Sequence, residues 1–434
     1  MVDFMNARVA VLLVASLGCI GSVGERADSG ASGGPASATG GGTGGGGTAG
    51  GEGTGGGSNG DIYLPWEGGP AYWSRWSHGP SSDPTSFPIA VWLQSPSNVR
   101  AYRAIGVNTF IGLYDGPTDD DLDRLTDAGV PAYCDQAGVW AQHLSDPIIE
   151  AWTQLDEPDN AQADGMGGYG PCIAPSVIQQ RYAAFRAADS TRPVYLSVGQ
   201  GAAWTDYYGR GSACAGHVQD YAQYALGADV LSFDIYPANS TDAPVQGNLW
   251  YVALGVDHLR DAVDAGKPVF AWIESTGIDG PSGAPTPAQV RAEVWMALIH
   301  GARGFGYFCH IFSPSFVEAG LLADPTMKAA VASLNQQVLA LAPALNTRSI
   351  SNSVTVATSN PQVPIDVMVK RSSGSLYLFA VSMRSQATQA TFTVQRAPGT
   401  AVEVLGESRA LTLDAGRLLD SFGAYEVHLY RIGP

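Results

Sequence analysis

The sequence predicts an α/β fold, a (β/α)8 TIM barrel followed by a small all-β sandwich domain. Between residues 87 and 342, eight short apolar runs alternate with segments of helical periodicity. A last helical pattern, MKAAVASLNQQVLALAPAL, ends this part, and from residue 350 onward the chain consists of short alternating strands. Eight strand and helix units over this length have the size and rhythm of a closed barrel.

The eight apolar runs are the expected barrel strands. They are bounded by turn residues and are rich in Val, Ile and aromatic side chains. They occupy residues 87–93, 108–114, 130–135, 149–156, 193–199, 229–237, 268–275 and 304–312. An open, doubly wound sheet is the rival architecture, and the absence of a GxGxxG motif after the first strand weakens it.

The segments between the strands have an apolar period near 3.6, which predicts helices. Examples are DDDLDRLTDAG, VIQQRYAAFRAAD, LWYVALGVDHLRDAVDAG and PAQVRAEVWMALIHGARG. Polar residues or proline open each segment and glycine closes several, as expected at helix ends.

Four segments divide the chain. Residues 1–24 combine Arg8 with an apolar run that is too short to span a bilayer, which indicates a secretory signal. Residues 25–60 are mostly Gly, Ser, Thr and Ala and are expected to form a flexible tether. Residues 61–345 are assigned to the catalytic barrel and residues 346–434 to the β-sandwich.

The small residues before Cys19 resemble the lipobox of bacterial lipoproteins, in which the cysteine is lipidated, although Ser16 stands where that family usually has leucine. This resemblance implies an extracytoplasmic protein that is anchored to the outer or cell-surface membrane through Cys19. Plain secretion is the alternative.

The other cysteines fall into two groups. Cys172 and Cys214 lie in long polar loops and could form a disulfide, whereas Cys134 and Cys309 lie in apolar strand-like runs and are expected to be buried thiols. No CxxC motif or histidine-rich spacing indicates a metal site, and no organic cofactor is implied.

The formal net charge of −17 arises from 40 acidic and 23 basic side chains. Binding of nucleic acid phosphates needs clustered Lys and Arg, so nucleic acid is excluded as a partner. Strongly anionic polysaccharides are also disfavoured, and neutral or cationic substrates fit better.

Two glutamates follow expected strands at the end of the barrel that carries active sites. Glu157 follows the fourth strand in WTQLDEPDN, and Glu274 ends the seventh in PVFAWIES. Strands four and seven lie across the barrel mouth, so both side chains could project into one cleft. Two carboxylates facing each other across a pocket are what glycoside hydrolysis requires.

On these residues the chain resembles the retaining glycoside hydrolases of clan A, which have a (β/α)8 barrel. The resemblance implies cleavage of β-glycosidic bonds in a neutral polysaccharide or oligosaccharide by double displacement, with Glu157 as acid/base and Glu274 as nucleophile. Asp156 stands where the family usually has an asparagine that binds the sugar 2-hydroxyl. Tyr236, in FDIYP, is implied to hydrogen-bond the nucleophile.

Further side chains near strand ends are candidates for substrate binding. Asp234 has the same facing as Tyr236 along the sixth strand. Trp272 has the same facing as Glu274 and is the first choice for stacking against a sugar ring, because sugars present apolar faces to aromatic rings. The remaining candidates are Tyr307, His310 and Trp204.

Two other functions stay open. One is a catalytically inactive barrel that binds carbohydrate as a surface lipoprotein, which Asp156 favours and the two glutamates oppose. The other is an inverting enzyme, which a carboxyl separation wider than about 5–5.5 Å would indicate.

Overall fold

The computed structural model describes residues 60–64, 69–166, 168–207, 214, 216–263 and 266–433. The predicted signal, Cys19 and the tether up to residue 59 lie outside the described residues. In the described part of the chain, no helix is long and apolar enough to cross a membrane.

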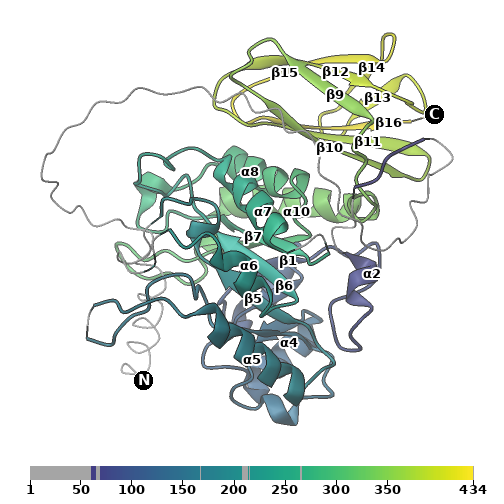
Figure 1. Cartoon of the computed structure of the whole chain (residues 1–434). Coiled ribbons are helices and arrows are strands. Elements are labelled where there is room, and N and C mark those ends of the chain that lie inside the picture. The colour runs from purple at the N-terminus through teal and green to yellow at the C-terminus, as the bar shows by residue number, and fades with distance from the viewer. Residues whose placement is uncertain are drawn as a thin grey trace, which may run out of the picture.

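Eight parallel strands close into a barrel in the order β1 to β8. Figure 1 labels β1, β5, β6 and β7 of this barrel. Each strand lies within one of the eight expected segments, so the predicted barrel is confirmed. The strands are β1 (Ile89–Trp92), β2 (Thr109–Ile111), β3 (Ala132–Cys134), β4 (Ile149–Thr153), β5 (Val194–Val198), β6 (Val230–Asp234), β7 (Val269–Glu274) and β8 (Gly304–Phe308).

Helices follow most of the strands. They are α2 (Pro70–Trp73), α3 (Val99–Arg103), α4 (Asp119–Ala128), α5 (Pro175–Ala188), α6 (Asp220–Ala225), α7 (Tyr251–Ala262), α8 (Pro287–Ile299), α9 (Gly320–Ala323) and α10 (Pro325–Leu345). Local sequence sets their ends. The Thr118 hydroxyl accepts a hydrogen bond from the Asp121 amide at the start of α4, and Gly129 ends that helix in the left-handed conformation.

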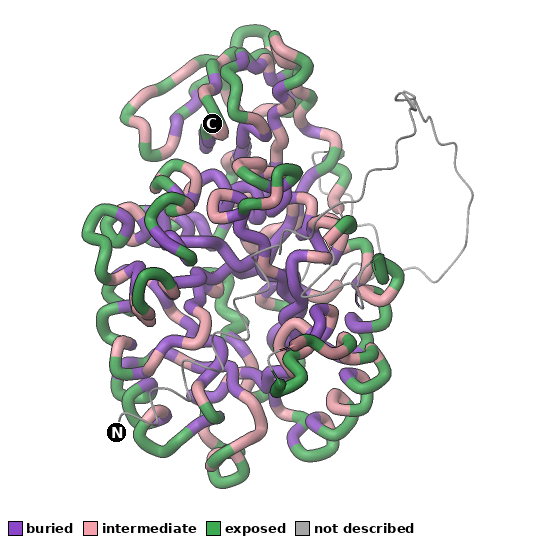
Figure 2. Tube along the Cα trace, turned by 90° about the vertical axis from the view of Figure 1, so that its left-hand side faces the viewer, coloured by how far each residue is buried: buried purple, intermediate pink, exposed green. Residues whose placement is uncertain are grey.

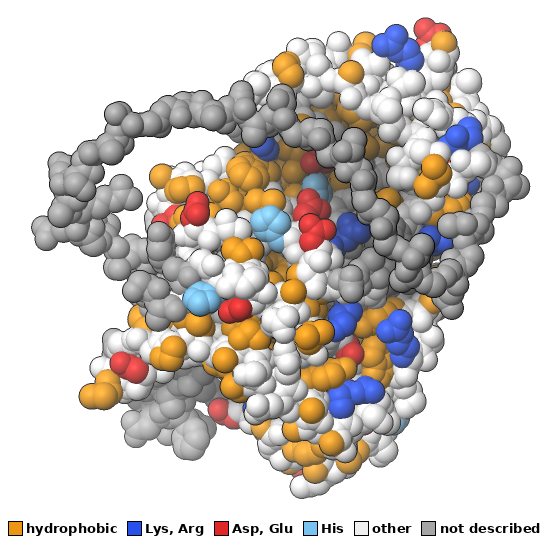
Figure 3. Space-filling view, in the orientation of Figure 1, with side chains coloured by type: hydrophobic (Ala, Val, Ile, Leu, Met, Phe, Trp, Pro, Cys, Tyr) orange, Lys and Arg blue, Asp and Glu red, His pale blue; other side chains and the backbone are white. Residues whose placement is uncertain are grey.

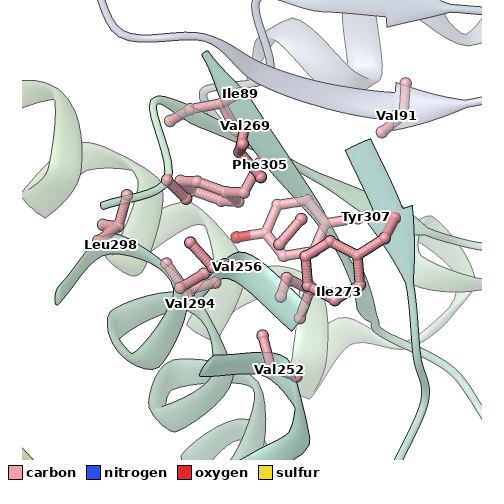
Figure 4. Close-up of a cluster of buried hydrophobic side chains, with 14 of the residues drawn as sticks. Ile89, Val91, Val252, Val256, Val269, Ile273, Val294, Leu298, Phe305 and Tyr307 are labelled. Atoms are coloured by element: carbon pink, nitrogen blue, oxygen red, sulfur yellow. The ribbon is translucent and has the colours of Figure 1, made fainter. Parts of the chain in front are cut away.

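The two faces of the barrel strands are both buried, which explains their continuous apolar runs. Side chains of β7, β8 and their neighbours pack outward against α7 and α8; Figure 4 shows Ile273, Phe305 and Tyr307 beside Val256 and Val294. Seen from the left-hand side of Figure 1, buried segments gather at the centre and exposed ones at the periphery (Figure 2).

A second, smaller cluster fills the barrel interior, with Tyr133, Tyr195, Phe270 and Trp272 among its members. On β8, a Cβ atom at Gly306 would lie 2.1 Å from the Trp272 ring, so only glycine fits beside that indole. The alternation of large rings and glycine therefore fills the interior without a pore.

The C-terminal part is an all-β domain of two antiparallel sheets, as predicted. One sheet has the order β10 (Ile365–Ser372), β11 (Ser375–Ser382), β16 (Val427–Ile432), β13 (Ala401–Val404), β14 (Arg409–Thr412). The other has the order β15 (Arg417–Phe422), β12 (Thr388–Val394), β9 (Val354–Thr358).

The β-domain packs beside α8 and α10 (Figure 1). Trp295 of α8 stacks on Phe379 of β11 with 5.3 Å between ring centroids. Phe379 belongs to the same buried cluster as the outer layer of the barrel, so the apolar core runs through the contact between the domains without a break.

Polar contacts reinforce this seam. His300 follows α8, and its two ring nitrogens contact Asp257 of α7 at 2.8 Å and Asp366 of β10 at 3.1 Å. Burial opposes a charge on this imidazole, but the hydrogen bonds with the two aspartates outweigh it and raise the pKa of His300 to about 9. The seam therefore holds a charged histidine between two carboxylates at neutral pH.

Residues 61–64, which the sequence assigned to the barrel, pair with the start of the β-domain. Tyr63 forms an antiparallel bridge with Ile350, and the Leu64 amide donates to the Ser349 carbonyl at 2.8 Å. The buried Asp61 carboxylate binds Arg371 at 3.0 Å and Arg396 at 3.4 Å. The described chain therefore enters the fold along the β-domain.

Candidate active site

Glu157 lies just beyond β4, where the chain turns into the loop to α5. Its φ is +41°, a left-handed conformation that residues other than glycine rarely adopt. The Glu157 amide donates to the Ser197 carbonyl of β5 at 3.0 Å, and the Glu157 carbonyl accepts from the Asn160 amide at 3.0 Å. Such strain persists only where the surroundings impose it, and it is concentrated at functional sites.

Polar groups lie beside the carboxylate of Glu157 in the described part of the chain. The Asn160 side-chain amide donates to Oε2 of Glu157 at 2.8 Å. The carboxyl group of Asp234, at the end of β6, lies within hydrogen-bonding reach of the Glu157 carboxylate. The sequence placed Asp234 near the substrate, but it did not predict this contact between two acids.

The pKa of Asp234 is raised well above its ordinary value. Burial is the largest cause, and the charges of Glu157, Asp156 and Asp159 add to it. Among the described residues, Oδ1 of Asp234 accepts no hydrogen bond from a donor group. A hydrogen bond between two carboxyl groups forms only when one holds a proton, and the raised pKa of Asp234 favours its protonated form.

Asp159 extends this acidic cluster. Its carboxylate accepts hydrogen bonds from the Gly199 amide at 2.8 Å and the Tyr221 hydroxyl at 2.9 Å. Burial, partly offset by the Gly199 hydrogen bond, raises the pKa of Asp159 to about 6, and the charge of Glu157 contributes to the rise. The loops that follow β4 and β5 are thus joined directly beside Glu157.

Glu274, at the end of β7, has different surroundings. Its side chain is fully buried, and its two oxygens accept from the amides of Ala238 at 2.6 Å and Asn239 at 2.8 Å. The Asn239 side-chain amide also donates to Oε2. These contacts attach Glu274 to the loop between β6 and α7.

A second buried acid stands beside Glu274. The carboxyl group of Glu293, in the middle of α8, lies within hydrogen-bonding reach of Glu274. Burial and then the charge of Glu274 raise the pKa of Glu293 well above its ordinary value. Glu274 therefore contacts the β6–α7 loop and the helix layer, whereas Glu157 contacts Asp234.

Two of the predicted sugar-binding side chains belong to the interior cluster. Trp272 is 3% exposed, and its indole nitrogen donates to the Tyr195 hydroxyl at 3.0 Å, so its ring helps to fill the barrel interior. Tyr236 packs on Phe308 with 5.2 Å between ring centroids. Trp272 thus faces inward, as its strand position predicted, but it offers little surface to a sugar.

The structure contradicts the substrate-binding role of Tyr307. Its ring lies in the outer core of Figure 4, is 0% exposed, and its hydroxyl donates to Oδ1 of Asn335 in α10 at 2.8 Å. The strand alternates, so a residue between two inward-facing neighbours, Gly306 and Phe308, faces the helices.

His310 is also withdrawn from the site, against the prediction. It is 0% exposed, and its Nε2 contacts the Leu93 carbonyl at 3.1 Å and the Gln94 side chain at 3.2 Å. Burial lowers the pKa of His310 to about 4, so the ring is neutral. Its contacts join the ends of β1 and β8.

The loops after β4 and β5 contain three further predicted residues. Trp204 packs beside Tyr207 with 5.9 Å between ring centroids. Cys172 and Cys214 line one cavity, both as thiols. Cys134 and Cys309 are buried, as expected.

The sequence interpretation missed Asp159, Asn160, Asn239 and Glu293. Asp159 and Asn160 stand two and three residues after Glu157 in DEPDN. The run of polar residues there could have indicated that they lie beside Glu157. Asn239 and Glu293 act through contacts between segments far apart in sequence, which no local pattern reveals.

The distribution of basic side chains and of metal-ligating side chains also bears on the site. On the face in Figure 3, lysine and arginine side chains are scattered rather than gathered in one basic surface. Within the described ranges, no group of three or more His, Cys, Asp or Glu side chains could hold a metal ion.

No protein-family model matches the sequence, and no curated protein matches it. Solved structures do share the fold at low sequence identity. AmyP in complex with maltose aligns with a TM-score of 0.52 and 9% identity, over 81% of this chain and 97% of that one. The α-amylase of Geobacillus thermoleovorans in complex with acarbose aligns with a TM-score of 0.51 and 9% identity, over 81% of this chain and 99% of that one. A candidate α-galactosidase of Bacteroides fragilis aligns with a TM-score of 0.50 and 13% identity, over 81% of this chain and 80% of that one. This chain therefore has the barrel and β-domain architecture that these proteins share.

Proposed function

We propose that the protein is a glycoside hydrolase whose reacting carboxyl groups are Glu157 and Asp234. The observation that carries this proposal is the contact between these two acids beyond β4 and β6, with Glu157 in a strained backbone conformation. Glu274 and Glu293 are also two acids in contact, but both oxygens of Glu274 accept hydrogen bonds from the β6–α7 loop, whereas Glu157 combines the contact with a strained backbone at the end of the barrel that carries active sites.

The proton distribution suggests the role of each group. Asp234 holds the proton, because burial and the neighbouring charges raise its pKa. The two carboxyl groups of a retaining glycosidase stand about 5–5.5 Å apart, so a bound sugar has to separate this pair. Asp234 then protonates the glycosidic oxygen, while the Glu157 carboxylate stabilises or attacks the sugar carbon as positive charge develops there. Asn160 orients Glu157 through its 2.8 Å hydrogen bond.

The assignment implied by the clan A resemblance is the second candidate. It uses Glu157 as acid/base and Glu274 as nucleophile in a double displacement at a β-glycosidic bond. Its support is the position of Glu274 at the end of β7. Because Glu274 is fully buried, this mechanism requires the sugar to reach a carboxylate that the surrounding side chains enclose.

A neutral polysaccharide or oligosaccharide is the proposed substrate class, because a chain of net charge −17 repels anionic polymers. The apolar run before Cys19 and the tether after it favour work outside the cytoplasm, either secreted or anchored through Cys19 to the membrane.

The test is hydrolysis of a panel of α-linked and β-linked neutral polysaccharides by the full chain, measured by released reducing ends. Release by the parent and its loss in Asp234→Asn would support the proposal and identify the bond. An Asp234→Asn variant as active as the parent would refute the proposed pair.

The same panel addresses the inactive alternative. Saccharide binding, measured by calorimetry, without release of reducing ends from any substrate would favour a carbohydrate-binding surface lipoprotein instead. Glu157→Gln is the matched control, because it preserves shape and should keep the binding.

A further inference from the structure

The loops that follow β4 and β5 meet at a cavity beside the acidic cluster. One wall contains Asp159 and Cys172 from the first loop, and the other contains Cys214 from the second loop and Tyr221 from α6. The Tyr224 hydroxyl donates to the Ile173 carbonyl, next to Cys172, so the two walls already touch.

The two thiols approach each other within this cavity. The Cys214 thiol lies within hydrogen-bonding reach of Cys172. A disulfide needs β-carbons about 3.5–4.5 Å apart, a spacing that two thiols in mutual contact approach with little backbone movement. Cys214 is 8% exposed and Cys172 is half-buried, so Cys172 is the sulfur that an oxidant reaches first.

We propose that Cys172 and Cys214 form a disulfide that locks the β4–α5 and β5–α6 loops together beside Glu157. This inference does not depend on the reaction proposed above. It needs an oxidant of the small-molecule disulfide class, such as oxidised glutathione.

The chemistry is two thiol–disulfide exchanges. The Cys172 thiolate attacks the small disulfide, forms a mixed disulfide and releases one glutathione thiolate. The Cys214 thiolate then attacks the Cys172 sulfur and releases the second glutathione. Two protein thiols are oxidised, one small disulfide is reduced, and the two thiol protons pass to the released thiolates.

The position of the bond determines what it would hold. The Ile173 amide donates to the Pro158 carbonyl at 2.8 Å, so the chain beside Cys172 is fastened to the residue after Glu157. Asp159 links the same segment to Gly199 and Tyr221. The disulfide would therefore make this hydrogen-bonded connection between the loops covalent.

Cys134 and Cys309 provide an internal control. Both are 0% exposed, on β3 and just beyond β8. Burial, the largest effect, raises the pKa of the Cys309 thiol to about 12. These two thiols should react only after unfolding, so they report whether the oxidant has disrupted the fold.

The experiment equilibrates the full chain with reduced and oxidised glutathione at several ratios. Free thiols are then alkylated, and disulfide-linked peptides are mapped by mass spectrometry. The expected result is a peptide pair linked through Cys172 and Cys214, with Cys134 and Cys309 alkylated only after denaturation. Alkylation of Cys172 and Cys214 at every ratio would overturn the proposal, as would a link from either of them to Cys19.

Thermal unfolding gives a second readout. Closing a loop between the two positions should raise the Tm of the oxidised parent by about 5 °C relative to the reduced parent. Cys172→Ser and Cys214→Ser should each abolish this redox-dependent difference. A difference that persists in both variants would show that another bond causes it.

Discussion

The ends of β4 and β7 look alike in sequence and differ in structure. Each has a glutamate at the end of an apolar strand, Glu157 and Glu274. Both contact another acid, but Glu157 has a strained backbone, whereas Glu274 has both oxygens satisfied by backbone amides and no exposure. The difference shows that the position of a carboxylate on a barrel strand does not determine its surroundings, because the neighbouring loops decide which groups it contacts.

The largest expected effect is on turnover. Glu157→Gln should lower kcat by about 1000-fold or more, because it removes a charge that acts on the sugar, whereas Glu274→Gln should stay within about 10-fold of the parent. Steady-state kinetics on the substrate identified in the panel would measure both. Loss of turnover in Glu274→Gln, with an unchanged Tm, would instead establish the double displacement that uses Glu274.

For the free energy of unfolding, substitution of Glu274 should have a larger effect than substitution of Glu157. Glu274→Ala leaves the amides of Ala238 and Asn239 without a hydrogen-bond acceptor. It is expected to reduce the free energy of unfolding by about 3 kcal/mol, measured by urea denaturation. Glu293→Gln is the control. It keeps the shape and hydrogen-bonding capacity beside Glu274 and should cost less than about 1 kcal/mol. An equal loss in both variants would indicate that packing, rather than the amide contacts, is responsible.

His300, between the barrel and the β-domain, allows a test of stability that involves neither Glu157 nor Glu274. The pKa of His300 is raised from 6.5 to about 9, so its charged form stabilises the fold fully below about pH 6.5. That contribution is lost as the pH rises through 9. His300→Gln should reduce the free energy of unfolding by about 1 kcal/mol at pH 6 and flatten the decline between pH 6.5 and 9. An unchanged decline in the variant would assign it to other groups.

The smallest effect tests the strain at Glu157. Glycine adopts a φ of +41° without steric cost, so Glu157→Gly should raise the free energy of unfolding by up to about 1 kcal/mol while abolishing activity. Asp115→Gly, at a φ of +60° in another loop, is the matched control for the backbone effect alone. Destabilisation by Glu157→Gly would mean that contacts of the side chain outweigh the strain.

The sequence was sufficient for the fold because periodicity is a local property. All eight strands lie in the expected segments, since strands buried on both faces appear as continuous apolar runs. Inward or outward facing was harder to predict. Tyr307 was assigned to the site from its place near the end of β8, but it lies one residue out of phase with the inward face, against Asn335.

The site was predictable only in part. Glu157 and Asp234 could be selected from their positions after β4 and at the end of β6, but their contact arises from the placement of the loop after β4 relative to β6. The partners of Glu274 are equally remote in sequence, with Asn239 in one loop and Glu293 on α8. Burial of a carboxylate can be suspected from an apolar run, but the amides that satisfy it cannot be identified there.

The entry of the chain through the β-domain has a mechanical consequence. Asp61 is clamped by Arg371 and Arg396, and Tyr63 is paired with Ile350. A force that pulls on the chain upstream of Asp61 is therefore borne by the β-domain, as shear across this short pairing. The barrel strands and the loops around Glu157 lie outside that load path, so tension on the leading segment would reach the β-domain before it could deform the site.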